Sequence, residues 1–294
     1  MKFRIYSIVL LGLSLILNSC SKKHDDAIIF GFIPSSNIEE VESVSDSLCQ
    51  MLSEETGLKI KAFVAPDYAS LIESIRTKHV QIAWFAPMSF VEAEAVGSLT
   101  PLLTSVRAGK PYFYSGIFVR ADSRIFSIED LRGKIMGFTD PTSTAGRIFP
   151  EADIRKKGYN PESFFKQVVY LGGHDKVVGA VLDGIVDAGA SFANDTINVD
   201  NAWHQFLKNK DDVRKFRVIH YTSPIPGDVI ACLTSMKEKS PEHIKLITEK
   251  LLKISGEKSG QRLIKKLNRT DSLLPANIET YNAVREASKL VIIE

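Results

Sequence analysis

The spacing of apolar residues switches between strand-like runs and helix-like repeats along most of the chain. In the first block, β-branched and aromatic runs alternate with segments whose apolar residues recur every three or four positions. These patterns predict strands at 27–33, 58–64 and 80–85, and helices at 41–56 and 71–75. Gly57 is expected to end the first helix. Such alternation predicts a parallel sheet flanked by helices.

A second block of the same kind follows a run, 114–119, that reads as a strand leaving the first block. Strands are expected at 134–138, 168–171 and 186–190, and helices after 139–144 and over 174–182. Pro150 predicts a short turn or kink in the first of these helices. A strand at 217–221 returns toward the first block, and the remainder reads as mostly helical, with helices from Pro241 and around 278–284.

These elements predict an α/β protein of two lobes joined by two strand crossings that act as a hinge, with the ligand cleft between the lobes. We expect lobe 1 to comprise residues 28–117 plus 225–294, and lobe 2 residues 118–224. The length of 294 residues suits two such units.

The N-terminus reads as an export signal. Lys2 and Arg4 precede an apolar run over residues 5–17, which is too short to span a bilayer as a helix. The following Leu-Asn-Ser-Cys, ending at Cys20, resembles the lipobox of bacterial lipoproteins. We therefore expect residues 1–19 to be a signal peptide, and 20–27 an acylated cysteine and tether. A plain signal peptide with an incidental cysteine is the alternative.

The charge balance argues against nucleic-acid binding, and the positions of the cysteines argue against a disulfide. Removing Lys2 and Arg4 with the signal takes the basic count from 37 to 35, equal to the 35 acidic residues, so nucleic-acid binding is not expected. Cys49 falls on an apolar helix face and Cys232 in a strand-like run, which favours two buried free thiols over a disulfide.

Small polar residues gather in the loops after predicted strands, where open α/β sheets bind ligands. The sharpest such loop is Pro141–Gly146, with Thr142, Ser143 and Thr144 at a predicted helix start. Unpaired N–H groups and hydroxyls there suit a tetrahedral oxyanion. An ordinary helix cap explains the same residues. A second helix start carries His174, which on its own is as well explained by a structural role.

Taken together, several segments resemble the phosphate-, phosphite- and phosphonate-binding proteins of ABC importers, the PhnD type. They occur in the family's order and cover most of residues 28–230: 30–35, 56–59, 67–69, 80–85, 140–144, 174–175 and 223–228. The resemblance implies a type II periplasmic binding protein fold with the anion between the lobes. It also implies a ligand held by Ser143, Thr144, the adjoining backbone at Ala145, and His174, with Tyr68 opposite. Asp228 matches a carboxylate that meets the ligand's amine in aminophosphonate binders.

The chain departs from the family's pattern at three places. Ala145 stands where a third hydroxyl is common. A pocket tyrosine corresponds either to Phe113 or to Tyr114. The second acidic residue of aminophosphonate binders falls near Asn194 or Asp195, and Asn194 in its place would weaken the case for an amine-bearing ligand. Further candidate ligand contacts are Ser35, Phe85 and Thr142.

The resulting hypothesis is a lipid-anchored, extracytoplasmic binding protein that delivers a phosphorus oxyanion to an ABC permease. We expect it to be a monomer without cofactor or metal, since the six histidines are scattered. Closure of the lobes would neutralise the anion without a dedicated arginine. A sensory module presenting a small anion to a membrane receptor is one alternative. A serine hydrolase using Ser143, His174 and Asp228 is another, although no Gly-x-Ser-x-Gly elbow surrounds Ser143.

Overall fold

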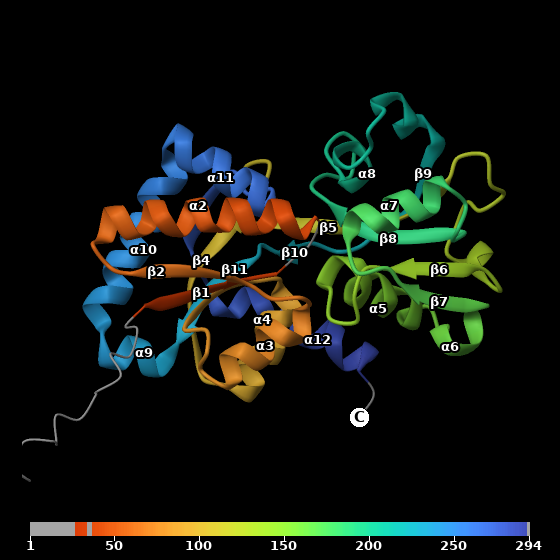
Figure 1. Cartoon of the computed structure of the whole chain (residues 1–294). Helices are drawn as coiled ribbons and strands as arrows, with labels where there is room; N and C mark the ends of the chain where they lie inside the picture. The colour runs from red at the N-terminus through yellow and green to blue at the C-terminus, as the bar shows by residue number, and fades with distance from the viewer. Residues whose placement is uncertain (1–26, 34–36, 293–294) are drawn as a thin grey trace, which may run out of the picture.

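The computed structural model describes residues 27–33 and 37–292. Two α/β lobes, each built on its own sheet, lie side by side and are joined by extended segments (Figure 1). The proposed signal peptide and tether over residues 1–26, with Cys20, lie outside the described residues. Within them, no helix is both long and apolar enough to cross a membrane. We call the lobe that contains the first sheet lobe 1 and the other lobe 2.

The sheet of lobe 1 has the strand order β12-β4-β11-β3-β1-β2. Strands β1, β2 and β3 pair in parallel, as predicted, but β11, β4 and β12 join antiparallel, so the expected all-parallel sheet is wrong. The strands are Ile28–Phe32 (β1), Ile60–Val64 (β2), Ile82–Phe85 (β3), Leu99–Val106 (β4), Val229–Leu233 (β11) and Ser272–Pro275 (β12).

The sheet of lobe 2 is mixed as well, with the order β10-β5-β8-β6-β7 and β9 paired to β5. Its strands are Tyr112–Arg120 (β5), Ile135–Phe138 (β6), Gln167–Tyr170 (β7), Ala188–Ala193 (β8), Phe216–Tyr221 (β9) and Ile225–Pro226 (β10). The chain thus enters this sheet at Tyr112 and leaves it after Pro226. The lobe boundaries drawn from the sequence stay a prediction.

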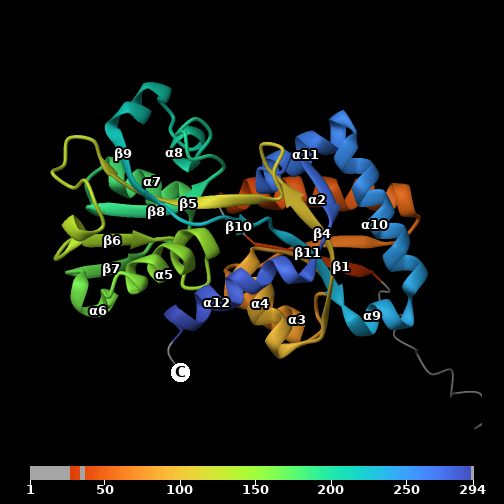
Figure 2. The same ribbon diagram turned by 180° about the vertical axis from the view of Figure 1, so that it is seen from behind.

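Helices cover both faces of each sheet, as the two opposite views show (Figures 1 and 2). In lobe 1 these are Ile38–Thr56 (α2), Tyr68–Arg76 (α3), Pro87–Val96 (α4), Thr234–Lys239 (α9), Pro241–Gly256 (α10), Lys258–Asn268 (α11), Ile278–Tyr281 (η4) and Asn282–Val291 (α12). In lobe 2 they are Glu129–Leu131 (η1), Thr144–Ile148 (η2), Phe149–Lys156 (α5), Pro161–Phe164 (α6), His174–Leu182 (α7), Ala202–Gln205 (α8) and Lys210–Lys215 (η3).

The helix ends follow local chemistry. The side chain of Asn37 caps α2, and Gly57 ends that helix in the left-handed region at φ +69°, donating its N–H to the Ser53 carbonyl over 2.8 Å. The turn expected at Pro150 is present as the π-helical turn η2, which leaves Pro150 within the first two positions of α5. There its missing N–H costs no hydrogen bond.

The hydrophobic core continues from one lobe into the other. One cluster runs from Leu71 and Met88 of lobe 1 through Phe113 to Val177 and Trp203 of lobe 2, whereas a second, under α2 and α10, belongs to lobe 1 alone. Helix α12 packs on both α4 and α5 and so contacts both lobes. The lobes therefore stand closed on one another.

Several elements depart from the sequence-based prediction. The segment after residue 225, expected to be mostly helical, contains strands β11 and β12, and β11 lies in the middle of its sheet. Strand β4 and helix α4 were not expected at all. The two cysteines behave as predicted: Cys49 and Cys232 are buried free thiols whose pKa burial raises.

Candidate functional site

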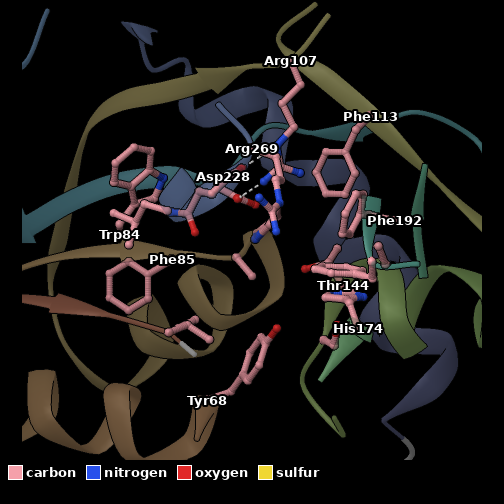
Figure 3. A pocket seen from close by; sticks show the side chains of 18 residues that line it. Tyr68, Trp84, Phe85, Arg107, Phe113, Thr144, His174, Phe192, Asp228 and Arg269 are labelled. Carbon is pink, nitrogen blue, oxygen red and sulfur yellow. Dashed lines mark hydrogen bonds and ion pairs between the residues drawn. The ribbon is translucent and has the colours of Figure 1, made fainter. Parts of the chain in front are cut away.

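A small cavity of about 50 Å³ lies between the lobes. Lobe 2 lines one side of it and lobe 1 the other, with Tyr68 directed into the space between them (Figure 3). The lining residues are Ile33, Tyr68, Trp84, Phe85, Ala86, Pro87, Arg107, Phe113, Ser143, Thr144, Ala145, His174, Phe192, Phe206, Asp228, Leu267, Asn268 and Arg269. Strands β1, β3 and β6 end toward it, which is where α/β sheets bind ligands.

The loop from β6 into η2 forms the polar floor on the lobe 2 side. The Asp140 carboxylate accepts from the N–H and hydroxyl of Thr142 at 2.8 and 2.9 Å, which sets the turn before the helix. Ser143 then caps η2, accepting from the N–H of Gly146 at 3.1 Å. The first-turn N–H groups at Thr144 and Ala145 have no acceptor within the helix, so they are donors for an anion.

Gly146 is required for this turn to form. A Cβ atom there would lie 2.2 Å from the Thr139 hydroxyl oxygen, well inside van der Waals contact. The backbone of Thr139 donates to the Gly146 carbonyl over 3.2 Å, which holds the strand end and the helix start together. The close approach of these two segments fixes where Ser143 and Thr144 stand.

His174 begins α7 on the same side of the cavity. Its Nδ1 contacts the Ser191 hydroxyl at 2.8 Å and the Thr139 hydroxyl at 3.3 Å, so only Nε2 remains for a ligand. Burial, with the charge of Arg107 adding to it, lowers the pKa of His174 to about 3. The imidazole is therefore neutral at physiological pH.

A hydrogen bond crosses the cleft at this point. The Thr144 hydroxyl accepts from the Met88 N–H over 2.8 Å, at the start of α4 in lobe 1. Tyr68, the first residue of α3, lines the same cavity from lobe 1. Burial first, and then the charge of Asp140, raise the pKa of Tyr68, so its hydroxyl keeps its proton and can donate. Thr144 of the loop between β6 and η2 thus takes part in closure.

The lobe 1 side carries the charges. Arg107 forms an ion pair with Asp228, and the two side chains are only 8% and 12% exposed. The Nε of Arg107 donates to the Asn268 carbonyl at 3.1 Å, and its guanidinium lies 4.6 Å from the centre of the Phe113 ring. Burial raises the pKa of Asp228, with Arg107 acting in the opposite direction.

Arg269 brings a second guanidinium to the same end of the cavity (Figure 3). It follows α11 in the left-handed region, at φ 56°, and lies 5.2 Å from the centre of the Phe206 ring of lobe 2. Burial lowers the pKa of Arg269; the charge of Glu40 opposes this, Arg107 adds to it, and Asp200 and Asp175 oppose it as well. Two arginines thus line the cavity, and whether either binds the anion directly stays a prediction.

The six residues predicted as ligand contacts all line the cavity, as do Phe85 and Phe113 from the further candidates. Three further candidates do not. Thr142 bonds to Asp140, Tyr114 packs against Tyr112, and Asn194 donates to Asp200 at 3.1 Å. Ser35 lies outside the described residues. Of Phe113 and Tyr114, the two candidates for the position of the family's pocket tyrosine, Phe113 is the one that lines the cavity.

Sequence reasoning missed Arg107, Arg269, Phe192 and Phe206 as lining residues. Arg107 follows a strand that was not recognised, and Arg269 follows a helix with an ordinary basic face. No local pattern distinguishes either residue from a surface arginine.

The residue types of a nucleophilic triad are present but not connected. Ser143 caps η2, His174 contacts Ser191 and Thr139 through Nδ1, and Asp228 pairs with Arg107. Within the described part of the chain, no three His, Cys, Asp or Glu side chains gather as metal ligands would. The arrangement is one of donors and positive charge around a small space.

Two mixed α/β lobes closed over a cavity of hydroxyl, N–H and guanidinium donors form the fold of a type II periplasmic binding protein. The family model of the ABC transporter phosphonate periplasmic substrate-binding proteins matches residues 30–281. The chain belongs to that family.

Curated relatives and solved structures agree with this. The phosphate-import protein PhnD of Mycolicibacterium smegmatis is 30% identical over 70% of this chain, and the phosphonates-binding periplasmic protein of Escherichia coli 29% over 76%. The matched region spans 66% of each relative's length. PhnD1 of Prochlorococcus marinus in complex with methylphosphonate, 20% identical, has the same fold, with a TM-score of 0.77 over 90% of this chain and 98% of that one.

Proposed function

We propose that the protein captures a small phosphorus oxyanion (a phosphonate, phosphite or phosphate) outside the cytoplasm and delivers it to an ABC permease. The observation that carries this is the Ser143–Ala145 turn, which opens onto a closed cavity between the lobes. Tyr68 and His174 flank the turn there. The donors of one tetrahedral anion are thereby gathered in one place.

In the proposed complex the hydroxyls of Ser143 and Thr144 and the first-turn N–H groups bind the phosphorus-bound oxygens. Tyr68 donates from lobe 1, and neutral His174 offers Nε2. Phe85 and Phe113 line the remaining space. Hydrogen bonds to a charged oxyanion are worth about 1.5–3 kcal/mol each, so a few suffice for micromolar binding. The names of two relatives, a phosphate-import protein and a phosphonates-binding protein, support the same ligand class.

Thermal unfolding with added ligand tests this proposal. Phosphate, phosphite and methylphosphonate are added separately, with sulfate as the control anion. A ligand at 100 times its dissociation constant adds about 2.7 kcal/mol to the free energy of unfolding. Stabilisation by a phosphorus compound but not by sulfate is expected. Equal responses to sulfate and to every phosphorus compound, or no response at all, contradict the proposal.

The lipid anchor is a separate part of the proposal, and it rests on Cys20 and the sequence before it. Acylation would hold the binding lobes near the membrane that contains the permease. Expression with a labelled fatty acid tests this: the wild type incorporates label and sediments with membranes, and Cys20→Ala does neither. Label retained in Cys20→Ala would exclude Cys20 as the acylated residue.

The last part of the proposal is that the protein binds and delivers its ligand without reacting with it. Ser143, His174 and Asp228 are not connected as a nucleophilic triad, so the ligand should be released unchanged. Incubation of bound methylphosphonate followed by phosphorus NMR should recover only the starting compound. Stoichiometric appearance of inorganic phosphate would contradict this.

A further inference from the structure

The charged side chains at the lobe 1 end of the cavity would contact the substituent of a bound phosphonate. Among the described lining residues only Arg107, Asp228 and Arg269 carry charge near neutral pH, since His174 and Tyr68 are neutral. The lining side chains at this end are therefore two guanidinium groups against one carboxylate. The opposite end, at η2, already supplies the donors for the phosphorus oxygens.

Asp228 is not available to a cationic ligand. Its carboxylate is paired with Arg107 in an almost completely buried ion pair. Arg107 is itself fixed by the Asn268 carbonyl and the ring of Phe113. A ligand ammonium group could use Asp228 only by separating this pair and leaving a buried guanidinium without a partner, which is strongly unfavourable.

Arg269 stands in the opposite situation. Within residues 27–33 and 37–292 it makes no ion pair, and its guanidinium lies against the ring of Phe206. The carboxylates of Glu40, Asp200 and Asp175 act on its charge, but none of them forms an ion pair with it. Its planar fork matches a carboxylate through two parallel N–H···O bonds.

We propose that Arg107, Asp228 and Arg269 form an anion-selective subsite, and that the preferred ligand is a phosphonate whose short substituent ends in a carboxylate. This rests on the proposed function. The phosphonate group binds at η2 and the carboxylate meets Arg269, while a substituent ending in an ammonium group is rejected. Both groups would lie within one small cavity, so the proposed substituent is short.

Calorimetric titration of the wild-type protein with three probes tests the subsite. Phosphonoacetate carries the second anion, methylphosphonate has no second charge, and 2-aminoethylphosphonate carries the ammonium group. We expect phosphonoacetate to bind at least tenfold more tightly than methylphosphonate, and 2-aminoethylphosphonate at least tenfold more weakly. A smaller ratio in either comparison overturns the inference.

A matched pair of variants assigns the preference to Arg269. Arg269→Gln should reduce the preference for phosphonoacetate over methylphosphonate at least tenfold, because the guanidinium is lost. Arg262→Gln removes the same charge from an exposed position on α11 and should leave the ratio unchanged. Equal loss of both ligands in Arg269→Gln, or the same change in both variants, contradicts the assignment.

The outcomes separate the inference from the function on which it rests. If methylphosphonate binds and the three probes bind equally well, the subsite is contradicted and the proposed phosphorus-oxyanion function is not. If none of the three probes binds, and neither phosphate nor phosphite binds, both proposals are contradicted. If Arg269→Gln does not fold by circular dichroism, Arg269→Lys keeps the charge without the fork and should lose part of the preference.

Discussion

The two walls of the cavity are built in different ways. The lobe 2 wall is neutral, made of hydroxyls, backbone N–H groups and an imidazole, and Ser143, Thr144 and Ala145 are consecutive in the chain. The lobe 1 wall carries the charges, and its residues Arg107, Asp228 and Arg269 come from three distant segments. Neighbouring residues thus build the neutral wall, and packing between distant segments builds the charged one.

The largest effect is expected from breaking the buried pair in the charged wall. Arg107→Met should lower the free energy of unfolding by about 3–5 kcal/mol at pH 7, because Asp228 is left buried without a partner. Asp122→Asn is the control: it removes one partner of the exposed Arg120–Asp122 pair and should cost less than about 1 kcal/mol. Denaturant titration measures both, and equal losses would mean that burial of the Arg107–Asp228 pair is unimportant.

The same variant has a characteristic pH dependence. Burial already raises the pKa of Asp228, and removing Arg107 takes away the charge that opposes this. A carboxyl whose pKa is higher in the folded than in the unfolded protein loses stability as the pH rises between the two values. The deficit of Arg107→Met should therefore shrink as the pH falls toward 5. A deficit independent of pH would show that lost packing, not the buried charge, causes it.

The neutral wall is tested by Thr144→Val, which keeps the shape and removes the hydroxyl. The hydroxyl accepts from Met88 across the cleft and is proposed to donate to the ligand. Affinity for the phosphorus oxyanion should fall about 10- to 100-fold, the range of one charge-assisted hydrogen bond. Thr142→Val, in the same loop but not lining the cavity, should change affinity less than about threefold. Calorimetry measures the affinity of both variants. A larger loss of affinity in Thr142→Val would mean that the ligand does not bind at Thr144.

The difference between the walls also explains what the sequence could reveal. Helix α7 occurs over the predicted residues 174–182, and the turn after β6 was recognised from its hydroxyls and proline, because both depend on neighbours in the chain. Strand β4 contains Pro101, which cannot donate to a sheet, so its pattern argued against a strand. Its pairing with β11 shifts register next to that point, between Ile230 and Ala231.

The charged wall was not predictable for the same reason. Asp228 was correctly expected at the cavity from its match to the family, but its partner Arg107 is 121 residues away. Pairing at that separation depends on the two crossing segments lying side by side. Helix α4 was missed because its apolar residues do not keep to one face: it packs on the sheet, on α3 and on α12. Burial on several sides removes the helical repeat that prediction needs.

Closure of the two walls brings Glu92 of lobe 1 toward Asp140 of lobe 2. Burial first, and then the charge of Asp140, raise the pKa of Glu92 to about 7, with Arg147 opposing them. Stability should therefore fall as the pH rises from about 4.5 to 7. Glu92→Gln should remove that slope and gain about 1 kcal/mol at pH 8. Thermal unfolding across pH measures this, with the exposed Glu39→Gln on α2 as the charge-matched control. A wild-type slope that persists in Glu92→Gln would assign it to another group.

The smallest effect on ligand affinity is expected from the contact between Arg269 of the lobe 1 wall and Phe206 of the lobe 2 wall. Arg269 lies over the ring of Phe206, and Phe206 also packs edge-on against Phe192. Phe206→Leu keeps an apolar side chain and removes the cation–π attraction, worth about 0.5–1 kcal/mol, so ligand affinity should fall about two- to fivefold. Phe126→Leu removes a similar contact with Arg217, away from the cavity, and should leave affinity unchanged. Of these two contacts, the one between Arg269 and Phe206 spans the lobes. Equal affinity in the two variants would therefore mean that the Arg269–Phe206 contact does not favour the closed state.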